Sequence, residues 1–329
     1  MSLLICTLSS FPRDYPFKPQ GNHWASIYLF FLGLDRRPHG FILESTVKKM
    51  PWTEDFHVNH EVKTVHLMTF IEDDPSIACT AALSNLVQKI IDEDSFRVIH
   101  GQHSEPYPIV GANFPVSVER YASQLLGIIS RGAHLTVYTN TTDRMMIWVP
   151  RRSPKLFTYP DCLDTIVAGG VSAGEGPLQC IVREAEEEAS LSKELVRRDT
   201  VACGCLSYIG QSDARGGGET GLLAPNIIYV YDLEVSEDVV CRQNDNEVEE
   251  FYLMTVDEVK AALFRGEFKT NSAVIMIDFL IRHGIITTDN ERNYAEIIAR
   301  MHRRLPFPTA PEENSEVYVV SSAPSCPPI

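Results

Sequence analysis

The segment from Gly169 to Leu191 constrains this chain more than any other part of its sequence. Within it, Glu184, Glu187 and Glu188 are spaced by three and four residues in an apolar pattern typical of a helix. Residues at these spacings share one helix face, so the three carboxylates repel one another unless a cation lies among them. A glycine-rich turn precedes the helix and lets the backbone approach a ligand. The segment therefore predicts a helix that binds Mg²⁺ or Mn²⁺ through carboxylate oxygens.

The spacing over the whole segment decides between a metal site and a solvated helix face. A run such as EAEEEA, taken alone, is typical of a solvated face. Here Gly169 is followed after five residues by Glu175, and seven further residues precede Arg183–Glu184. One small apolar residue and one unconstrained residue then separate this pair from Glu187–Glu188. The pattern resembles the Nudix box, with Ser190 where the box has Gly, and it favours the metal site over the solvated face.

The resemblance extends over most of the chain, roughly from Ile27 to Pro308. The motifs that carry it are DRRPHGFI, KKMPWTEDF, IWVPRRSPKLFTYPDCLDTIVAGG, YVYDLEV, NDNEVEEF, GEFKTNSAVIMIDFLIRHGIITTDN and MHRRLPFP. Together they resemble the Nudix proteins related to thiamin pyrophosphokinase. This implies an α/β fold, a Nudix α/β/α sandwich with a mixed sheet, preceded by a smaller α+β N-terminal domain. We expect the N-terminal domain in residues 1–132, the Nudix domain in 133–308 and a disordered Pro- and Ser-rich tail in 309–329.

The chain departs from that family's pattern in two places. Pro225–Asn226 stands where family members often carry Pro-Glu. Residues Gln102 to Glu105 stand where a Trp-Arg-Asn-Glu element is common. We expect these changes to alter substrate choice or to weaken activity, and we expect the N-terminal domain to shape substrate access.

The resemblance implies a Mg²⁺-dependent hydrolase that cleaves a diphosphate linkage to a monophosphate plus phosphate. Bound divalent ions neutralise the phosphate oxygens and lower the pKa of coordinated water. Oxidised or damaged thiamin-diphosphate-like compounds are the expected substrates, and an oxidised nucleoside diphosphate of the 8-oxo-dGDP type is the alternative. A catalytically weak ligand-binding protein on a Nudix fold is the alternative from another class. The intact carboxylates favour the enzyme, because a decayed site is expected to lose some of them.

The resemblance also assigns roles to the residues of the box. It implies that Glu184, Glu187 and Glu188 bind the metal. It gives Arg183 a structural pairing with a box carboxylate, either Glu175 or Glu187, and lets Glu175 reach a metal through water. Glu187 is the expected general base.

Residues outside the box complete the candidate site. Glu247 and Glu250 are the alternative bases, and alternation along a strand places them on opposite faces, so at most one faces the site. Arg151, Arg152 and Lys155 form a small basic cluster that either meets phosphate or lies in a solvated loop. An aromatic ring before the box either stacks on a substrate ring or packs in the core. The aromatic candidates are Trp148, Phe157, Tyr159 and His134.

Periodicity and turn residues predict the other elements. In the box helix, the expected buried stripe is Leu178, Ile181, Val182, Ala185 and Ala189. The expected strands cover residues 27–32, 39–43, 135–138, 145–150, 165–168, 201–208, 227–233 and 247–254. The expected helices cover residues 75–91, 118–130, 177–190, 255 onward, 272–283 and 288–304, and Thr255–Glu258 and Thr288–Glu291 are expected capping boxes.

Composition limits the class of protein. The chain has 329 residues, enough for two domains, and a formal net charge of -15, which argues against a nucleic-acid-binding surface. No apolar run reaches the length of a membrane span, and the N-terminal residues lack the basic start of a signal peptide. The eight cysteines contain no CxxC pair, and Cys203 and Cys205 are expected to be buried strand residues. We expect a cytoplasmic protein with reduced thiols and a small-molecule diphosphate as partner, whereas the sequence leaves the oligomeric state open.

Overall fold

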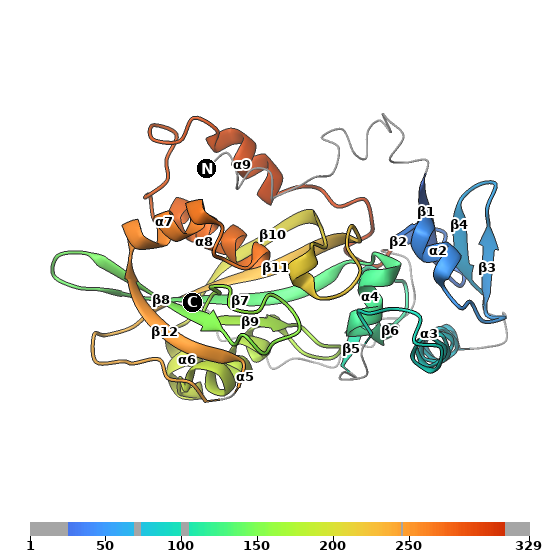
Figure 1. Cartoon of the computed structure of the whole chain (residues 1–329), viewed down its shortest axis with the longest axis horizontal. Helices are drawn as coiled ribbons and strands as arrows, with labels where there is room; N and C mark the ends of the chain where they lie inside the picture. Colours follow the sequence, from blue (N-terminus) through green and yellow to red (C-terminus); the bar gives the residue numbers. More distant parts are fainter. Residues whose placement is uncertain (1–25, 69–73, 100–104, 245, 313–329) are drawn as a thin grey trace.

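The computed structural model describes residues 26–68, 74–99, 105–244 and 246–312. Two parts of the chain, each with its own sheet, lie side by side along the longest axis (Figure 1). We call residues 26–129 the N-terminal part and residues 130–312 the C-terminal part. Three predictions concern residues outside these ranges and are not addressed by the structure. They are the reading of the N-terminal residues as no signal peptide, the departure at residues 102–104 and the tail beyond residue 312.

The N-terminal part is built on a four-stranded sheet in the order β2-β1-β4-β3. Helix α3 packs in the same apolar cluster, and its Asp74 N-cap accepts hydrogen bonds from the N–H groups of Ser76 and Ile77, as the sequence predicted. A small ribbon of two short strands and helix α4 lie next to the C-terminal part (Figure 1). The elements are β1 (Ile27–Leu32), β2 (Pro38–Leu43), α2 (Glu44–Lys49), β3 (Phe56–Asn59), β4 (Thr64–Leu67), α3 (Pro75–Asp92), β5 (Pro106–Pro108), β6 (Ser117–Glu119) and α4 (Arg120–Leu126).

The predicted helix over residues 118–130 was wrong at both ends. Helix α4 covers only Arg120–Leu126, and the glycine that ends it is Gly127, with φ +58°, rather than Gly132. A Cβ on Gly127 would lie 2.0 Å from the carbonyl oxygen of Phe41, so this turn is packed too tightly for a side chain. Strand β7 then begins at residue 130, three residues before the expected domain boundary at 133.

The C-terminal part contains a six-stranded mixed sheet in the order β10-β11-β7-β8-β12, with β9 paired to β7. Strands β7 and β11 run parallel, and the other pairs are antiparallel. Residues 132–135 of β7 pair with β9, whereas residues 138–140 pair with β8, so the sheet forks along β7. The strands are β7 (Ser130–Asn140), β8 (Met145–Arg152), β9 (Val167–Gly170), β10 (Val201–Gln211), β11 (Leu223–Glu234) and β12 (Val248–Thr255).

Helices cover both faces of this sheet, which confirms the predicted α/β/α sandwich. Helices α5 (Pro177–Ala189) and α6 (Lys193–Asp199) share one apolar cluster with the sheet. Helices α7 (Val256–Arg265), α8 (Thr270–Arg282) and α9 (Tyr294–Met301) share the cluster on the other face, above the sheet in Figure 1. A short 3₁₀ turn, η2 (Ala214–Gly216), lies between β10 and β11.

The start of the last helix differs from the prediction. Helix α7 begins with the expected Thr255–Glu258 capping box, but Thr288 and Glu291 do not open α9. Instead, the side chain of Asn290 accepts a hydrogen bond from the Thr287 N–H and holds a turn before the helix. Such side-chain bonds to the local backbone compete with helix formation, so α9 starts only at Tyr294.

Two burial expectations were also wrong. Leu178, expected in the buried stripe of α5, is 42% exposed. Cys205 is exposed and Cys203 partly exposed, because β10 is the edge strand of its sheet and its first residues are largely uncovered. The six cysteines within the described ranges are free thiols, as expected.

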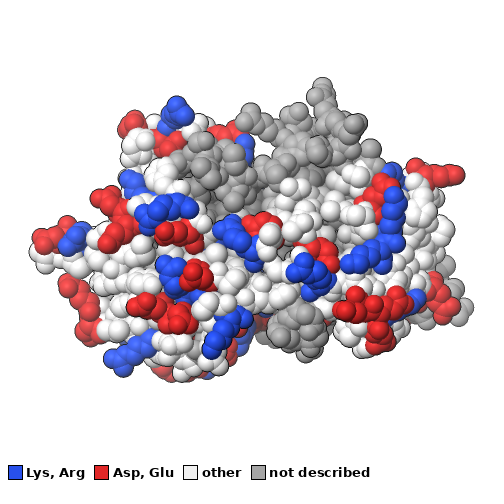
Figure 2. All heavy atoms as spheres, in the orientation of Figure 1, with Lys and Arg blue, Asp and Glu red and all other residues white. Residues whose placement is uncertain are grey.

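The surface shows no separation of charge on the face drawn in Figure 2, where basic and acidic side chains are interspersed. Of the described helices, none is both long and apolar enough to cross a membrane.

Candidate active site

Helix α5 presents the glutamates of the box beside strand β9. Its buried residues anchor one side of the helix against the sheet. The helix ends at Ser190, which stands where the box has Gly and adopts a left-handed conformation with φ 55°. The Ser190 N–H donates to the carbonyls of Ala185 and Glu186, so the turn that a glycine would allow is retained.

Gly169 allows Glu184 to lie directly on the backbone of β9. A Cβ at position 169 would be 2.7 Å from both Cγ and Oε1 of Glu184 and 2.8 Å from Sγ of Cys180. Any side chain there would displace Glu184 from the strand. The first glycine of the box is therefore required by close packing.

Arg183 joins the carboxylates of the box. Its Nε and Nη2 bind Oε1 and Oε2 of Glu175 at 3.1 and 3.2 Å. Its Nη1 lies 2.9 Å from Glu184 and 3.2 Å from Glu187. Both expected partners of Arg183 are thus contacted, and the arginine fixes the helix against the loop that precedes it.

Negative charge accumulates around the buried end of this cluster. Burial raises the pKa of Glu184, and the charges of Glu187 and Glu247 raise it further, while Arg183 opposes them. Burial also raises the pKa of Glu188 well above its usual range, with further contributions from Glu184, Asp164 and Glu247. Such a group of close carboxylates is stabilised by a bound cation.

The residues present fit a hard divalent ion in their chemistry. Within the described ranges, no three His, Cys, Asp or Glu side chains converge closely enough to hold a metal ion as they stand. Arg183 supplies the positive charge between Glu184 and Glu187 instead. Because the donors are carboxylate oxygens, Glu184, Glu187 and Glu188 would hold Mg²⁺ or Mn²⁺ in preference to a softer metal.

The two alternative bases lie in different surroundings. Glu247 raises the pKa of both Glu184 and Glu188, so its carboxylate is close to the box. Glu250 accepts a hydrogen bond from the hydroxyl of Tyr252 at 2.8 Å, on the strand next to β8. Of these two glutamates, only Glu247 contributes to the raised pKa of Glu184 and Glu188.

A cavity of about 220 Å³ adjoins the box, between the two parts of the chain. Gly169 and Gly170 of β9 form one side of it, and Lys269 at the start of α8 forms another. Two of the aromatic candidates, His134 and Tyr159, line this cavity, as does Asn226. The N-terminal part contributes Tyr107, Arg120, Tyr121 and Gln124.

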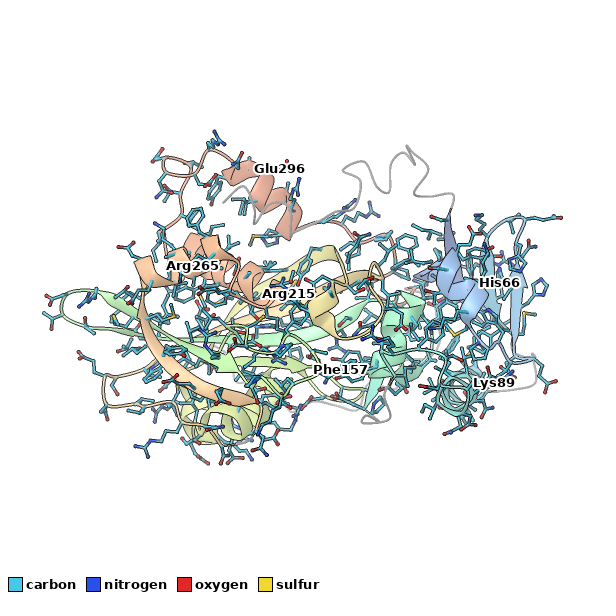
Figure 3. The ribbon with its side chains drawn as sticks, in the orientation of Figure 1. His66, Lys89, Phe157, Arg215, Arg265 and Glu296 are labelled. Carbon is cyan, nitrogen blue, oxygen red and sulfur yellow. The ribbon has the colours of Figure 1, made fainter. Side chains whose placement is uncertain are left out.

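The other expected substrate-binding residues do not line this cavity. Arg152 binds Asp164 at 3.0 Å and donates to the backbone carbonyls of Thr158 and Tyr159. Arg151 binds the hydroxyl of Tyr252 and the backbone carbonyl of Asp161. Trp148 packs in the apolar cluster beneath α5, and Phe157 lies at the surface against Gly217 (Figure 3).

Comparison with known proteins decides the family. A model of the NUDIX domain matches residues 130–272, a range that includes the box, the fork of the sheet and the start of α8. The chain contains a NUDIX domain. An uncharacterized protein of Saccharomyces cerevisiae is 37% identical to it over 308 residues, which are 91% of this chain and 90% of the yeast protein.

Two further proteins are similar to parts of the chain. Nudix hydrolase 20, chloroplastic, of Arabidopsis thaliana is 32% identical over 229 residues; the match spans 68% of this chain and 58% of the plant protein. The crystal structure of a MutT protein from Methanosarcina mazei Go1 is 14% identical, covers 47% of this chain and 95% of its own, and superposes with a TM-score of 0.35. The present Nudix protein is a hydrolase that acts on phosphoanhydrides.

Sequence reasoning missed a buried polar network behind the Nudix box. Asp164 is buried, and its carboxylate contacts Arg152, Lys269 at 3.3 Å and the hydroxyl of Ser272. Burial would raise the pKa of Asp164, but the charges of Lys269 and Arg152 outweigh it and hold this pKa below its usual range. Burial, followed by the charge of Lys269, lowers the pKa of His134 to about 3, so this histidine is neutral. Nothing in the local sequence indicates that residues 164 and 269 meet.

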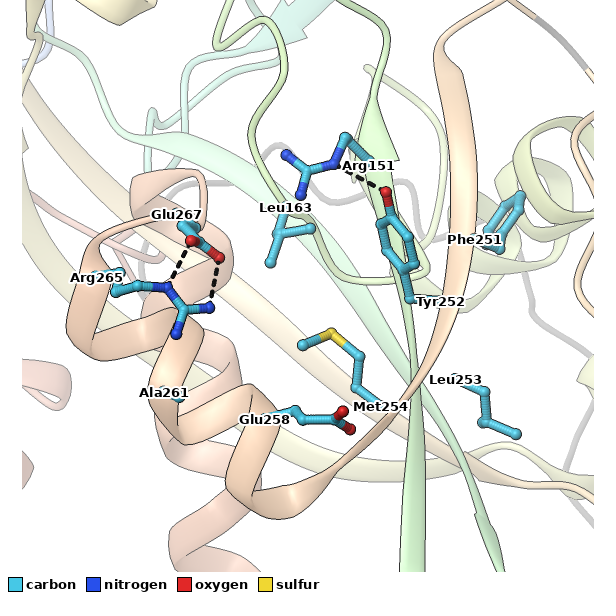
Figure 4. Close-up of a pocket in the computed structure, with 10 residues that line it drawn as sticks. All are labelled: Arg151, Leu163, Phe251, Tyr252, Leu253, Met254, Glu258, Ala261, Arg265 and Glu267. Carbon is cyan, nitrogen blue, oxygen red and sulfur yellow. Dashed lines mark hydrogen bonds and ion pairs between the residues drawn. The ribbon is translucent and has the colours of Figure 1, made fainter.

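A larger groove of about 590 Å³ lies elsewhere, between β12 and α7 (Figure 4). Its ten lining residues include Arg151, Tyr252 and the pair Arg265–Glu267, joined at 2.6 Å. None of the ten belongs to the Nudix box. The smaller cavity is therefore the better candidate for the substrate, since Gly169 and Gly170 of the box line it.

Proposed function

We propose that this Nudix hydrolase cleaves a small, thiamin-diphosphate-like substrate in its oxidised or damaged form to a monophosphate and phosphate. Mg²⁺ or Mn²⁺ would be held by Glu184, Glu187 and Glu188. The observation that carries the proposal is that the box gathers its carboxylates around Arg183, with Glu184 packed against Gly169, which lines a small cavity. Resemblance to the Nudix proteins related to thiamin pyrophosphokinase supports the substrate class.

Different groups supply charge, orientation and proton transfer in the proposed reaction. Bound divalent ions supply Lewis-acid polarisation of the phosphate oxygens and a lower pKa for coordinated water. Glu187 is the proposed base that takes the proton of the attacking water, with Glu247 as the alternative. Arg183 holds the glutamates in place through Glu175 and is a positioning residue.

The dimensions of the cavity limit the substrate. Pockets for drug-sized ligands measure about 300–1,000 Å³. The cavity beside the box is smaller, at about 220 Å³, and tyrosines and glycines line it. It suits one small ring system rather than two nucleosides. Amide side chains at Gln124, Asn226 and Asn271 also suit the edge of a base, which favours an oxidised nucleoside diphosphate as the second candidate.

Phosphate release with and without Mg²⁺ tests this proposal. The panel is thiamin diphosphate, its oxidised form and 8-oxo-dGDP. Glu187→Gln is expected to lower the Mg²⁺-dependent rate by roughly 10²–10⁴-fold, the usual contribution of a general base. Glu186→Gln is the matched control, because Glu186 is the adjacent residue and pairs with Lys193 at 2.5 Å, outside the site. Equal phosphate release by wild type and Glu187→Gln on every compound would show the proposed chemistry to be wrong.

A further inference from the structure

Two sequence motifs that the catalytic site does not use meet at one groove. The motifs are DRRPHGFI, near the start of the described chain, and MHRRLPFP, near its end. They meet because the chain leaves α9 and runs towards β2 (Figure 1). Arg37 and Pro38 of the first motif and residues 303–308 of the second line a groove of about 710 Å³. Its volume falls within the range of about 300–1,000 Å³ that is typical of sites for small ligands.

Hydrogen bonds hold both ends of the segment that forms this groove. The N–H of Arg303 donates to the carbonyl of Ser207 at 2.7 Å, and the hydroxyl of Ser207 donates to the carbonyl of Arg303 at 2.7 Å. At the other end, Nη1 of Arg37 donates to the carbonyl of Ala310 at 3.1 Å. Between these points, the side chain of Phe307 is buried. The groove is therefore built from packed and hydrogen-bonded segments.

The groove and the active-site cavity lie on opposite faces of the sheet. Ile227 and Tyr229 of β11 line the groove. Asn226 and Ile228, which alternate with them along the strand, line the cavity. Successive side chains of a strand point to opposite faces. Among the described residues, none lines both sites, so a ligand in the groove does not occupy the catalytic site.

The lining of the groove carries positive charge without a matching carboxylate. Arg37, Arg303 and Arg304 line it, and none of the described residues that line it is Asp or Glu. Such a surface is unusual in a chain with 29 basic and 44 acidic residues. Asp35, at 2.8 Å, neutralises Arg37, whereas Arg304 is exposed and forms no ion pair with another described residue. The groove therefore attracts anions, and the guanidinium of Arg304 has the planar set of donors that suits phosphate oxygens.

Tyr229 adds an aromatic surface beside these arginines. It lines the groove and also a neighbouring cavity of about 320 Å³. The guanidinium carbon of Arg131, which lines that neighbouring cavity, lies 5.6 Å from the centre of the Tyr229 ring. Nε of Arg131 is buried and has no hydrogen-bond partner in the part of the chain that the structure describes. This further cation strengthens the attraction for an anion, and the tyrosine can stack on a ring of the ligand.

We propose that the groove binds a phosphate monoester that carries an aromatic ring, at a site separate from the catalytic one. Arg304 binds the phosphate oxygens, with Arg303 beside it, and the ring of the ligand stacks on Tyr229. The inference does not depend on the substrate of the Nudix box, because no residue of the box lines the groove.

Alkylation of Cys205 measures occupancy of the groove. Cys205 lines the groove and is exposed, whereas Cys203 is partly exposed and does not line it. Iodoacetamide labels accessible thiols, and mass spectrometry gives the rate of labelling at each cysteine. Phenyl phosphate, titrated into the millimolar range without metal, is expected to slow the labelling of Cys205 and to leave that of Cys203 unchanged.

Two related compounds separate the contributions of the phosphate and the ring. Glycerol 3-phosphate has no aromatic ring, and it is expected to need a roughly two- to ten-fold higher concentration for the same protection of Cys205. Phenol has the ring without the phosphate, and it is expected to give no protection at the concentrations that suffice for phenyl phosphate. Tyr229→Leu is expected to bring the two phosphate esters to equal protection, because the stacking surface is lost.

Variants of Arg304 test the phosphate contact. Arg304→Gln is expected to raise the phenyl phosphate concentration for half protection by roughly ten-fold or more, the size of a charge-assisted hydrogen bond. Arg304→Lys retains the charge and is expected to retain part of the affinity. Arg36→Gln is the matched control, since it removes the same charge from an exposed arginine that does not line the groove. Thermal unfolding shows whether each variant is folded.

The outcomes that would overturn the inference are specific to the groove. One is equal labelling of Cys205 with and without phenyl phosphate, and another is equal protection in wild type and folded Arg304→Gln. An effect of Arg36→Gln as large as that of Arg304→Gln would also overturn it, because protection would then follow net charge alone. Glu187→Gln is expected to retain full protection, and its loss there would show that the probe occupies the catalytic site instead.

Discussion

Arg183 and Glu175 form a two-point ion pair, with Nε–Oε1 and Nη2–Oε2 distances of 3.1 and 3.2 Å. The pair connects the first helical turns of α5 to the loop that leaves β9. The hydrogen bonds to Glu175 raise the pKa of the Arg183 guanidinium above its usual value and outweigh burial, which opposes its charged state. The orientation of Glu184 and Glu187, which share Nη1 of Arg183, depends on this pair.

Arg183→Lys is expected to lower kcat roughly ten- to hundred-fold with little change in KM, because misplaced carboxylates weaken catalysis more than binding. Stability should fall by only about 1 kcal/mol, since the pair is partly exposed. Steady-state kinetics and urea unfolding measure the two effects. Arg198→Lys, at the exposed Arg198–Asp199 pair, is the control. A rise in KM with kcat unchanged would contradict a positioning role for Arg183.

Gly170→Ala is expected to lower the free energy of unfolding by about 1–3 kcal/mol, the usual cost of overpacking. The added methyl group would meet the hydroxyl oxygen of Tyr107. The loss should be smaller in a Tyr107→Phe background, because the closest atom is then absent. Urea unfolding of the four proteins measures the coupling, with Gly176→Ala as control, where a Cβ would be 3.4 Å from its nearest neighbour. Additive changes in the free energy of unfolding would show that Gly170 and Tyr107 are not energetically coupled.

Asp164→Asn is expected to cost about 3–5 kcal/mol of stability, because it leaves Lys269 and Arg152 with less compensating charge in a buried site. Asp161→Asn is the matched control on the same loop. Its side chain is 69% exposed and pairs with Arg151 at 3.5 Å, so the expected loss is below about 0.5 kcal/mol. Similar losses of unfolding free energy in the two variants would mean that the buried network contributes no more to stability than the exposed ion pair.

His134 is expected to make the protein sensitive to acid. The pKa of His134 falls from the ordinary 6.5 to about 3 on folding. The contribution of this histidine to the free energy of unfolding is therefore complete above pH 6.5 and is lost as the pH falls towards 3. The expected slope is about 1.4 kcal/mol per pH unit within this window. Unfolding free energies of wild type and His134→Asn, measured from pH 7 to 4, should converge as the pH falls. Parallel pH curves for wild type and His134→Asn would contradict this expectation. His57→Asn, at an exposed histidine, is the control.

Local pattern predicted much of the fold. The strand over residues 27–32, the Asp74 cap of α3 and the Thr255–Glu258 capping box were confirmed, because each depends on residues close together in the chain. The helix predicted to end at Gly132 failed, because contact with Phe41 makes Gly127 the residue that turns the chain. Local signals in the sequence do not report such contacts.

The sequence by itself predicted the metal-binding chemistry that we propose for this protein. Box glutamates, their arginine and the preceding glycines lie within one loop and one helix, so their spacing suffices to place them on one face. Only the tertiary structure decided what surrounds them. Ser172 meets Glu105 across 67 residues, and Lys269 meets Asp164 across 105. These contacts arise from the packing of distant segments, so the residues that enclose the cavity beside the box could be found only in the folded chain.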